Sequence, residues 1–254
     1  MKNIDWCIDY LKRVNDINQK INLPKERELR ALMNITMPNN LSDEFYKKQD
    51  FAIKEIYDEK VVVDVIDITP IKNKIYLYKG DITLIKADAI VNACNENLLG
   101  CFHPLHKCID NAIHSSAGLE VRRDLIKIMK AQGKTEENGK CKVTKAYNLP
   151  SNYIFHTVGP KVYGNVTKEN EIDLENCYLS CLKKANEMNI KSIVFPCIST
   201  GIYGYPKEEA ATLAYSTIKK YLEDNPNTSI NKIVFNVFTE EDYEYYKRII
   251  IKND

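Results

Sequence analysis

The residues DAIVNACNENLLGCFHPLHKCIDNAIHSSA, numbered 88 to 117, decide the fold of this 254-residue chain. They begin with an apolar run at 89–91, which predicts a buried β-strand, and polar residues follow directly. A short loop then brings Cys101, His106 and Cys108 within eight positions. The stretch ends with apolar residues three and four apart, as on one face of a helix. This order places the polar and sulfur-containing residues at the carboxyl end of a strand, where open α/β sheets bind their ligands.

Strand and helix patterns alternate over most of the remaining chain. Runs rich in β-branched and aromatic residues predict strands at residues 61–68, 74–78, 143–149, 153–158, 192–195 and 232–238. Helical patterns lie between them, at residues 117–130, 171–188, 207–223 and 241–251. This alternation predicts an α/β domain whose mixed sheet is covered by helices on both faces.

Residues 1–58 carry helical patterns only, so we predict a helical N-terminal extension at 1–58 and a main domain at 59–254. The extension contains no catalytic constellation of residues. We expect it to pack on the main domain, and a lid or a surface for docking a partner is the alternative.

The composition excludes several classes of protein. The 36 basic and 35 acidic residues leave a net charge of +1, which argues against a nucleic-acid partner. The first residues form neither a signal peptide nor a membrane span, so we expect a cytoplasmic protein whose eight cysteines are reduced thiols. No heptad pattern or exposed apolar run indicates obligate assembly, and a monomer is expected.

The spacing Cys101-x4-His106-x-Cys108 predicts a zinc site, because thiolates and imidazoles are the ligands that zinc prefers. Three protein ligands would leave the fourth tetrahedral position open, whereas a structural zinc site usually has four. His103 or Cys141 could still contribute through space. The alternative is that these are small buried cysteines beside a solvated histidine.

Two further loops follow predicted strands. In the loop at 199–206, two glycines allow backbone amides to face an anion such as a diphosphate, and a helix begins directly after it. Asp81 follows another strand, and its carboxylate could accept a hydrogen bond from an amine such as that of adenine. Taken singly, each of these loops could be an ordinary turn.

Five motifs in this order resemble the macrodomain family: residues 80–83, 88–95, 109–114, 156–160 and 199–206. The resemblance implies a three-layer α/β/α fold with a cleft for ADP-ribose. It also implies roles for single residues. Asp81 and Ile82 resemble the adenine contacts, Asn95 the contact to the distal ribose, and Tyr203 the ring beside that ribose. The residues that resemble the diphosphate loop are Ser199, Thr200, Gly201 and Ile202.

The loop at 100–108 departs from ordinary macrodomains, which carry a run of glycines there. In this respect the chain resembles a zinc-dependent branch of the family that also has a helical N-terminal extension. That resemblance implies an enzyme that removes mono-ADP-ribose from modified proteins. It further implies two partners, a lipoyl-carrier protein of the glycine-cleavage type and a sirtuin-like ADP-ribosyltransferase.

Hydrolysis by this protein would use zinc as a Lewis acid or as an activator of water. Asn95 would fix the ribose, and Asp110 would position or deprotonate the water. For Asp110 the alternative role is a carboxylate that stabilises the start of a helix. His114 is expected to pack behind the site, and His156 to be a hydrogen-bonded core residue. The alternative function is a reader that binds ADP-ribose without cleaving it, with zinc only ordering the loop.

Overall fold

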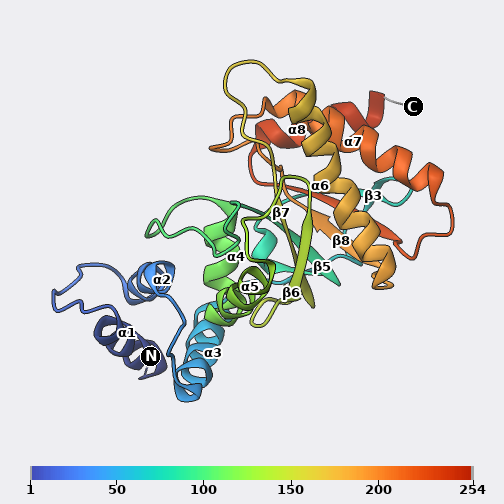
Figure 1. The fold of residues 1–254 in the computed structure, drawn as a ribbon. Helices are drawn as coiled ribbons and strands as arrows, with labels where there is room; N and C mark the ends of the chain where they lie inside the picture. Colours follow the sequence, from blue (N-terminus) through green and yellow to red (C-terminus); the bar gives the residue numbers. More distant parts are fainter. Residues whose placement is uncertain (1, 253–254) are drawn as a thin grey trace.

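A mixed seven-stranded sheet lies at the centre of the computed structural model, which describes residues 2–252 (Figure 1). Its strand order is β2 (Pro70–Lys72), β3 (Ile75–Lys79), β9 (Lys232–Val237), β8 (Ser192–Phe195), β5 (Ala89–Cys94), β7 (Tyr153–Val158), β6 (Cys141–Lys145). The inner five strands run parallel, whereas β2 and β6 pair antiparallel at the two edges. The carboxyl ends of the five parallel strands therefore meet along one side of the sheet, where ligand sites form in such sheets.

Helices cover both faces of this sheet, so the predicted three-layer α/β/α arrangement is confirmed. One face carries α6 (Lys168–Glu187), α7 (Lys207–Asp224) and α8 (Glu240–Lys252), and the other carries α4 (Ile109–Ala117) and α5 (Leu119–Gln132) (Figure 1). A hydrophobic core lies between the sheet and the helices on each face, and side chains of β5 alternate between the two cores. Ala89 and Val91 point into the core under α6, α7 and α8, and Ile90 points into the core under α4 and α5. Within residues 2–252, no helix combines the length and the apolar character that a membrane span needs.

The N-terminal helices α1 (Lys2–Val14), α2 (Lys25–Ile35) and α3 (Asp43–Tyr57) form a third core beside α4 and α5 (Figure 1). Helix α3 begins where the Ser42 hydroxyl accepts a hydrogen bond from the Phe45 amide at 3.1 Å, an ordinary N-terminal cap. Leu119, the first residue of α5, is buried in this core. The N-terminal segment is therefore helical and packed on the rest of the chain; the division into domains at 58 and 59 remains a prediction.

Two predicted strands are wrong in extent. Of residues 61–68, only β1 (Val63–Asp64) is a strand, and it pairs with β4 (Ile85–Lys86) outside the main sheet. The Asp64 carboxylate accepts a hydrogen bond from the Ile66 amide at 3.1 Å, which turns the chain and leaves Ile66 exposed. The strand predicted at 143–149 ends at Lys145, because Tyr147 adopts a left-handed conformation with φ of +51°.

The predicted helix at 117–130 begins later than expected, because Gly118 separates α4 from α5 with φ of +101°. A Cβ atom at this position would lie 2.6 Å from Gln49 Nε2 and 2.7 Å from Glu120 Oε2. The absence of a side chain lets Gln49 of α3 reach the junction. There it accepts a hydrogen bond from the Leu119 amide and donates one to Glu120, both at 2.8 Å.

The Glu120 carboxyl makes the stability of the protein depend on pH. Burial raises the pKa of Glu120 to about 7, although the hydrogen bond from Gln49 lowers it in part. The folded state therefore binds the proton of the Glu120 carboxyl more tightly than the unfolded state does. The stabilisation of the folded state by this protonated carboxyl is complete below about pH 4.5 and is lost as the pH rises through 7. Glu120→Gln should therefore raise the free energy of unfolding at pH 8 by about 2–3 kcal/mol and change it little at pH 4. Urea denaturation at both pH values checks this, with the exposed Glu59→Gln as control; equal effects at both would contradict it.

Candidate functional site

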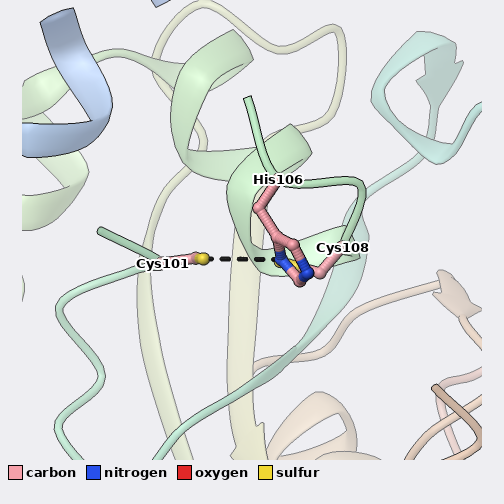
Figure 2. A group of neighbouring side chains, drawn as sticks. All are labelled: Cys101, His106 and Cys108. Atoms are coloured by element: carbon pink, nitrogen blue, oxygen red, sulfur yellow. Dashed lines mark hydrogen bonds between the residues drawn. The ribbon is translucent and has the colours of Figure 1, made fainter. Parts of the chain in front are cut away.

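The ligand atoms of Cys101, His106 and Cys108 converge in the loop between β5 and α4 (Figure 2). All three atoms lie within 4.8 Å of one another, and Cys101 Sγ lies 3.6 Å from His106 Nδ1. Cys108 is also the N-cap of α4, where its sulfur accepts a hydrogen bond from the Asn111 amide at 3.4 Å. The structure thus brings together the three residues that the sequence predicts as metal ligands.

The spacing of this group fits a zinc ion. With Zn–S of about 2.3 Å and Zn–N of about 2.0–2.1 Å, tetrahedral sulfur and nitrogen ligands lie about 3.6 Å apart. Burial raises the pKa of the Cys108 thiol to about 12, so a bound cation would have to displace its proton. His103 is exposed, and its ring centroid lies 6.1 Å from that of His106. Within residues 2–252 the group includes no fourth histidine, cysteine or carboxylate.

Cys141, the other alternative ligand, lies elsewhere. It borders an open hollow of about 440 Å³ beside β6 and α6, together with several lysines. Three of these lysines pair with glutamates: Lys134 with Glu137, Lys142 with Glu136, and Lys184 with Glu187. This hollow therefore offers neither a convergent set of metal ligands nor a strong positive charge that would attract an anion. The group of Cys101, His106 and Cys108 remains the candidate site.

Asp110 lies in the first turn of α4 and heads a buried polar network. Its Oδ1 accepts a hydrogen bond from Asn92 at 2.8 Å, and burial raises the pKa of Asp110 to about 6. His114 Nε2 lies 3.4 Å from the same oxygen, but burial holds the pKa of His114 far below its usual range, so the contact joins a neutral ring to a carboxyl. His156 bonds to Thr144 at 2.9 Å and lies 3.3 Å from Asn92, which confirms a satisfied core histidine.

The carboxyl end of β3 carries Asp81 and Ile82. Asp81 Oδ1 accepts hydrogen bonds from the amide and the hydroxyl of Thr83, at 2.9 and 2.7 Å. The second carboxylate oxygen and the Ile82 amide have no partner among the described residues. The Gly80 amide donates a hydrogen bond to the Val237 carbonyl at the end of β9, which brings the next residue, Phe238, close to this end of β3. The side chain of Phe238 is 78% exposed. Sequence reasoning missed Phe238, because an aromatic residue at a strand end reads as part of the strand.

The loop from Ser199 to Tyr203 follows β8 and presents free amides. Its carbonyl groups are used internally: Ser199 accepts from Tyr205 and Gly201 from Gly204, both at 3.0 Å. No amide of residues 199–203 donates to an acceptor within the described part of the chain. The Ser199 hydroxyl is buried without a partner, and a Cβ atom on Gly159 would lie 2.1 Å from it. The loops after β7 and β8 therefore touch, and a row of donors is left for an anion.

Asn95 lies at the start of the loop at 95–108 that carries Cys101, His106 and Cys108, which we call the metal loop. Its Nδ2 donates to the Gly100 carbonyl at 3.2 Å, and its Oδ1 accepts from the Asn97 amide at 3.0 Å. One Nδ2 hydrogen remains for a ligand. Beside it, Lys161 forms an ion pair with Glu96 at 3.2 Å and lies 5.3 Å from the ring centroid of Tyr203. Sequence reasoning missed this ion pair, because its two partners come from loops that follow different strands.

Comparison with known proteins shows the family to which this chain belongs. A family model described as Macro domain matches residues 91–214. A Staphylococcus aureus protein named "Protein-ADP-ribose hydrolase" is 41% identical over 251 residues, which cover 96% of this chain and 93% of the relative. The chain belongs to the macrodomain family. This macrodomain protein thus shares nearly its whole length with that relative, N-terminal helices included.

Solved structures agree with this family. A mutant of the Oceanobacillus iheyensis macrodomain with ADPR superposes with a TM-score of 0.65 and 33% identity, covering 73% of this chain and 97% of that one. A Trypanosoma brucei macrodomain gives a TM-score of 0.67 and 28% identity, covering 92% of this chain and 95% of that one. The macrodomain fold is therefore confirmed. The second match must also extend into the N-terminal helices, which the first one does not require.

Proposed function

We propose that this macrodomain protein is a zinc-dependent hydrolase that removes mono-ADP-ribose from modified proteins. The carrying observation is the Cys101, His106 and Cys108 group, which lies in the loop that leaves β5 at the carboxyl ends of the parallel strands, where ligand sites form in such sheets. The name of the S. aureus relative supports the hydrolase activity, and the O. iheyensis structure with ADPR supports the ligand.

The ligand would extend from the end of β3 to the end of β5. Asp81 and the Ile82 amide would hold the adenine, since both have free hydrogen-bonding atoms, and Phe238 offers an exposed ring on which a purine can stack. The amides of Ser199, Thr200, Gly201 and Ile202 would bind the diphosphate without the help of a net basic charge. Asn95 and Tyr203 would then lie beside the distal ribose.

Zinc held by Cys101, His106 and Cys108 would supply a Lewis acid with one open coordination position. Asn95 would fix the orientation of the distal ribose, and such orientation lowers a barrier substantially. Asp110, two residues beyond Cys108, would accept a hydrogen bond from the attacking water. One water is consumed, and the products are free ADP-ribose and the unmodified side chain.

The substrate class of this proposal is a protein that carries ADP-ribose. A lipoyl-carrier protein of the glycine-cleavage type as substrate, and a sirtuin-like ADP-ribosyltransferase as the enzyme that modifies it, belong to the proposal through the family resemblance alone.

Release of ADP-ribose from a modified protein tests the proposal. The protein as purified should release free ADP-ribose from an acidic protein that carries mono-ADP-ribose. Removal of the metal with a chelator should abolish this release, and added zinc should restore it. Chromatography of the released nucleotide gives the rate, and calorimetry with free ADP-ribose checks that the chelated protein still binds. A protein that contains zinc and binds ADP-ribose but releases none would be a reader, and the enzymatic proposal would be wrong.

A further inference from the structure

The metal loop contains a turn that its own sequence does not favour. Between the ligands Cys101 and His106, the His106 amide donates to the His103 carbonyl at 3.2 Å and closes a turn over Pro104 and Leu105. Leu105 has φ of +57°. This conformation suits glycine or asparagine at the third position of a turn, and it is unfavourable for leucine. Something outside the turn must therefore hold it.

Asn34 of α2 supplies one contact. Its Oδ1 accepts a hydrogen bond from the Leu105 amide at 3.0 Å, and its Nδ2 donates to the Ser115 hydroxyl at 2.9 Å. The Ser115 hydroxyl in turn donates to the Asn111 carbonyl at 2.6 Å, so it can only accept from Asn34. This fixes the orientation of the Asn34 amide and points its oxygen at Leu105. Asn34 is 1% exposed, so water does not compete for the bond.

Arg30, one turn earlier on α2, supports the other end of the same turn. Its Nε and Nη2 both donate to Asn111 Oδ1, at 3.0 and 2.7 Å. The Asn111 Nδ2 then donates to the His103 carbonyl at 3.1 Å. The turn is thus held at its first and third residues, directly or through one side chain, by the N-terminal helix.

Arg122 of α5 provides a third connection, just before Cys101. Its guanidinium is 1% exposed and donates to the Leu99 carbonyl at 2.7 Å and to the carbonyls of Met33 and Thr36 at the end of α2, at 3.0 and 2.5 Å. It also lies 4.4 Å from the ring centroid of Phe102. The segment that enters the metal loop is therefore tied to the same helix end.

We infer that α2 positions the metal loop, and that Asn34 is the positioning residue that holds Leu105 in the left-handed conformation from which His106 reaches Cys101. This inference rests on the metal site of the proposed function. It assigns a task to the N-terminal helices that is neither a lid nor a docking surface: they hold the ligands in place before the metal binds, which reduces the cost of binding.

Asn34→Ala tests the inference through the metal itself. The zinc-loaded variant should release zinc to a chromogenic chelator about 10-fold faster than the unchanged protein, as loss of an outer hydrogen bond at a metal site does. Hydrogen exchange at the Leu105 amide should lose its protection in the same variant. Adding Leu105→Gly should restore slow release in part, because glycine adopts positive φ without cost.

Asn15→Ala is the matched control. It removes hydrogen bonds to the Leu11 carbonyl and the Thr36 hydroxyl inside the N-terminal helices, but not the bond from Arg122 to the Thr36 carbonyl, so zinc release should stay within about twofold of the unchanged protein. If Asn34→Ala releases zinc at the original rate, or no faster than Asn15→Ala, the inference is wrong although the metal site stands. If the unchanged protein takes up no zinc, the proposed function fails instead.

Discussion

Cys108→Ser is expected to remove the metal and to lower the rate of ADP-ribose release by about 10²–10³-fold, since a Lewis acid contributes several kcal/mol to such a reaction. Serine is the informative replacement because Cys108 also caps α4 through its sulfur. A serine hydroxyl is at least as good a cap, whereas it is a poor ligand for zinc. The variant therefore separates the loss of the metal from the loss of the helix cap. Elemental analysis and single-turnover release measure the two effects.

Two controls accompany this variant. Cys141→Ser removes a thiol outside the metal group and should leave both metal content and turnover unchanged. Asp81→Ala should give the opposite pattern, retaining the metal but weakening ADP-ribose binding by about 1–3 kcal/mol if the adenine amine is left unpaired. Should Cys108→Ser keep a full equivalent of zinc, the ligand assignment is wrong.

Asp110→Asn is expected to lower turnover by about 10²–10⁴-fold, the usual contribution of a group that takes part in proton transfer, without loss of zinc or of stability. Asparagine keeps an oxygen that accepts the hydrogen bond from Asn92. It also avoids the cost of a buried negative charge, so the fold has no reason to weaken. Single-turnover release, elemental analysis and thermal denaturation of the same preparation measure the three quantities.

The opposite result for Asp110→Asn has a definite meaning. A variant with full turnover but a lower melting temperature would show that Asp110 is a carboxylate that stabilises the start of α4, as its place in the first turn allows. Glu120→Gln is the matched control, because it also neutralises a buried carboxyl, but one that faces Gln49 rather than the metal loop.

Sequence alone predicted those features that depend on neighbouring residues or on strand direction. Cys101, His106 and Cys108 are near in sequence and lie in one short loop, so their proximity was predictable, whereas the turn that brings His106 to Cys101 depends on contacts from α2. The ends of β3, β5 and β8 share one side because parallel strands all point the same way. The strand at 61–68 failed for a local reason: the Asp64 side chain captures the Ile66 amide, which outweighs the β-branched composition.

The hydrogen bonds that hold the metal loop could not be predicted in this way. Asn34, Arg30 and Arg122 read as ordinary polar positions on helices, and nothing near them in sequence marks their partners. Their contacts arise only after α2 packs against α4 and α5, which brings together residues that are 71–89 positions apart. The left-handed conformation of Leu105 also has no signal in the sequence, because leucine does not favour it.

The separation of Asn34 and Arg30 from their partners also bears on how the chain assembles on the ribosome. Leu105 is synthesised 71 residues after Asn34, and Asn111 is synthesised 81 residues after Arg30. Until then the amide and the guanidinium must stay in water, because burying them without partners is costly. The segment translated first therefore cannot reach its final position before residues 105 and 111 have been synthesised, and the loop that carries Cys101, His106 and Cys108 is held in the same event.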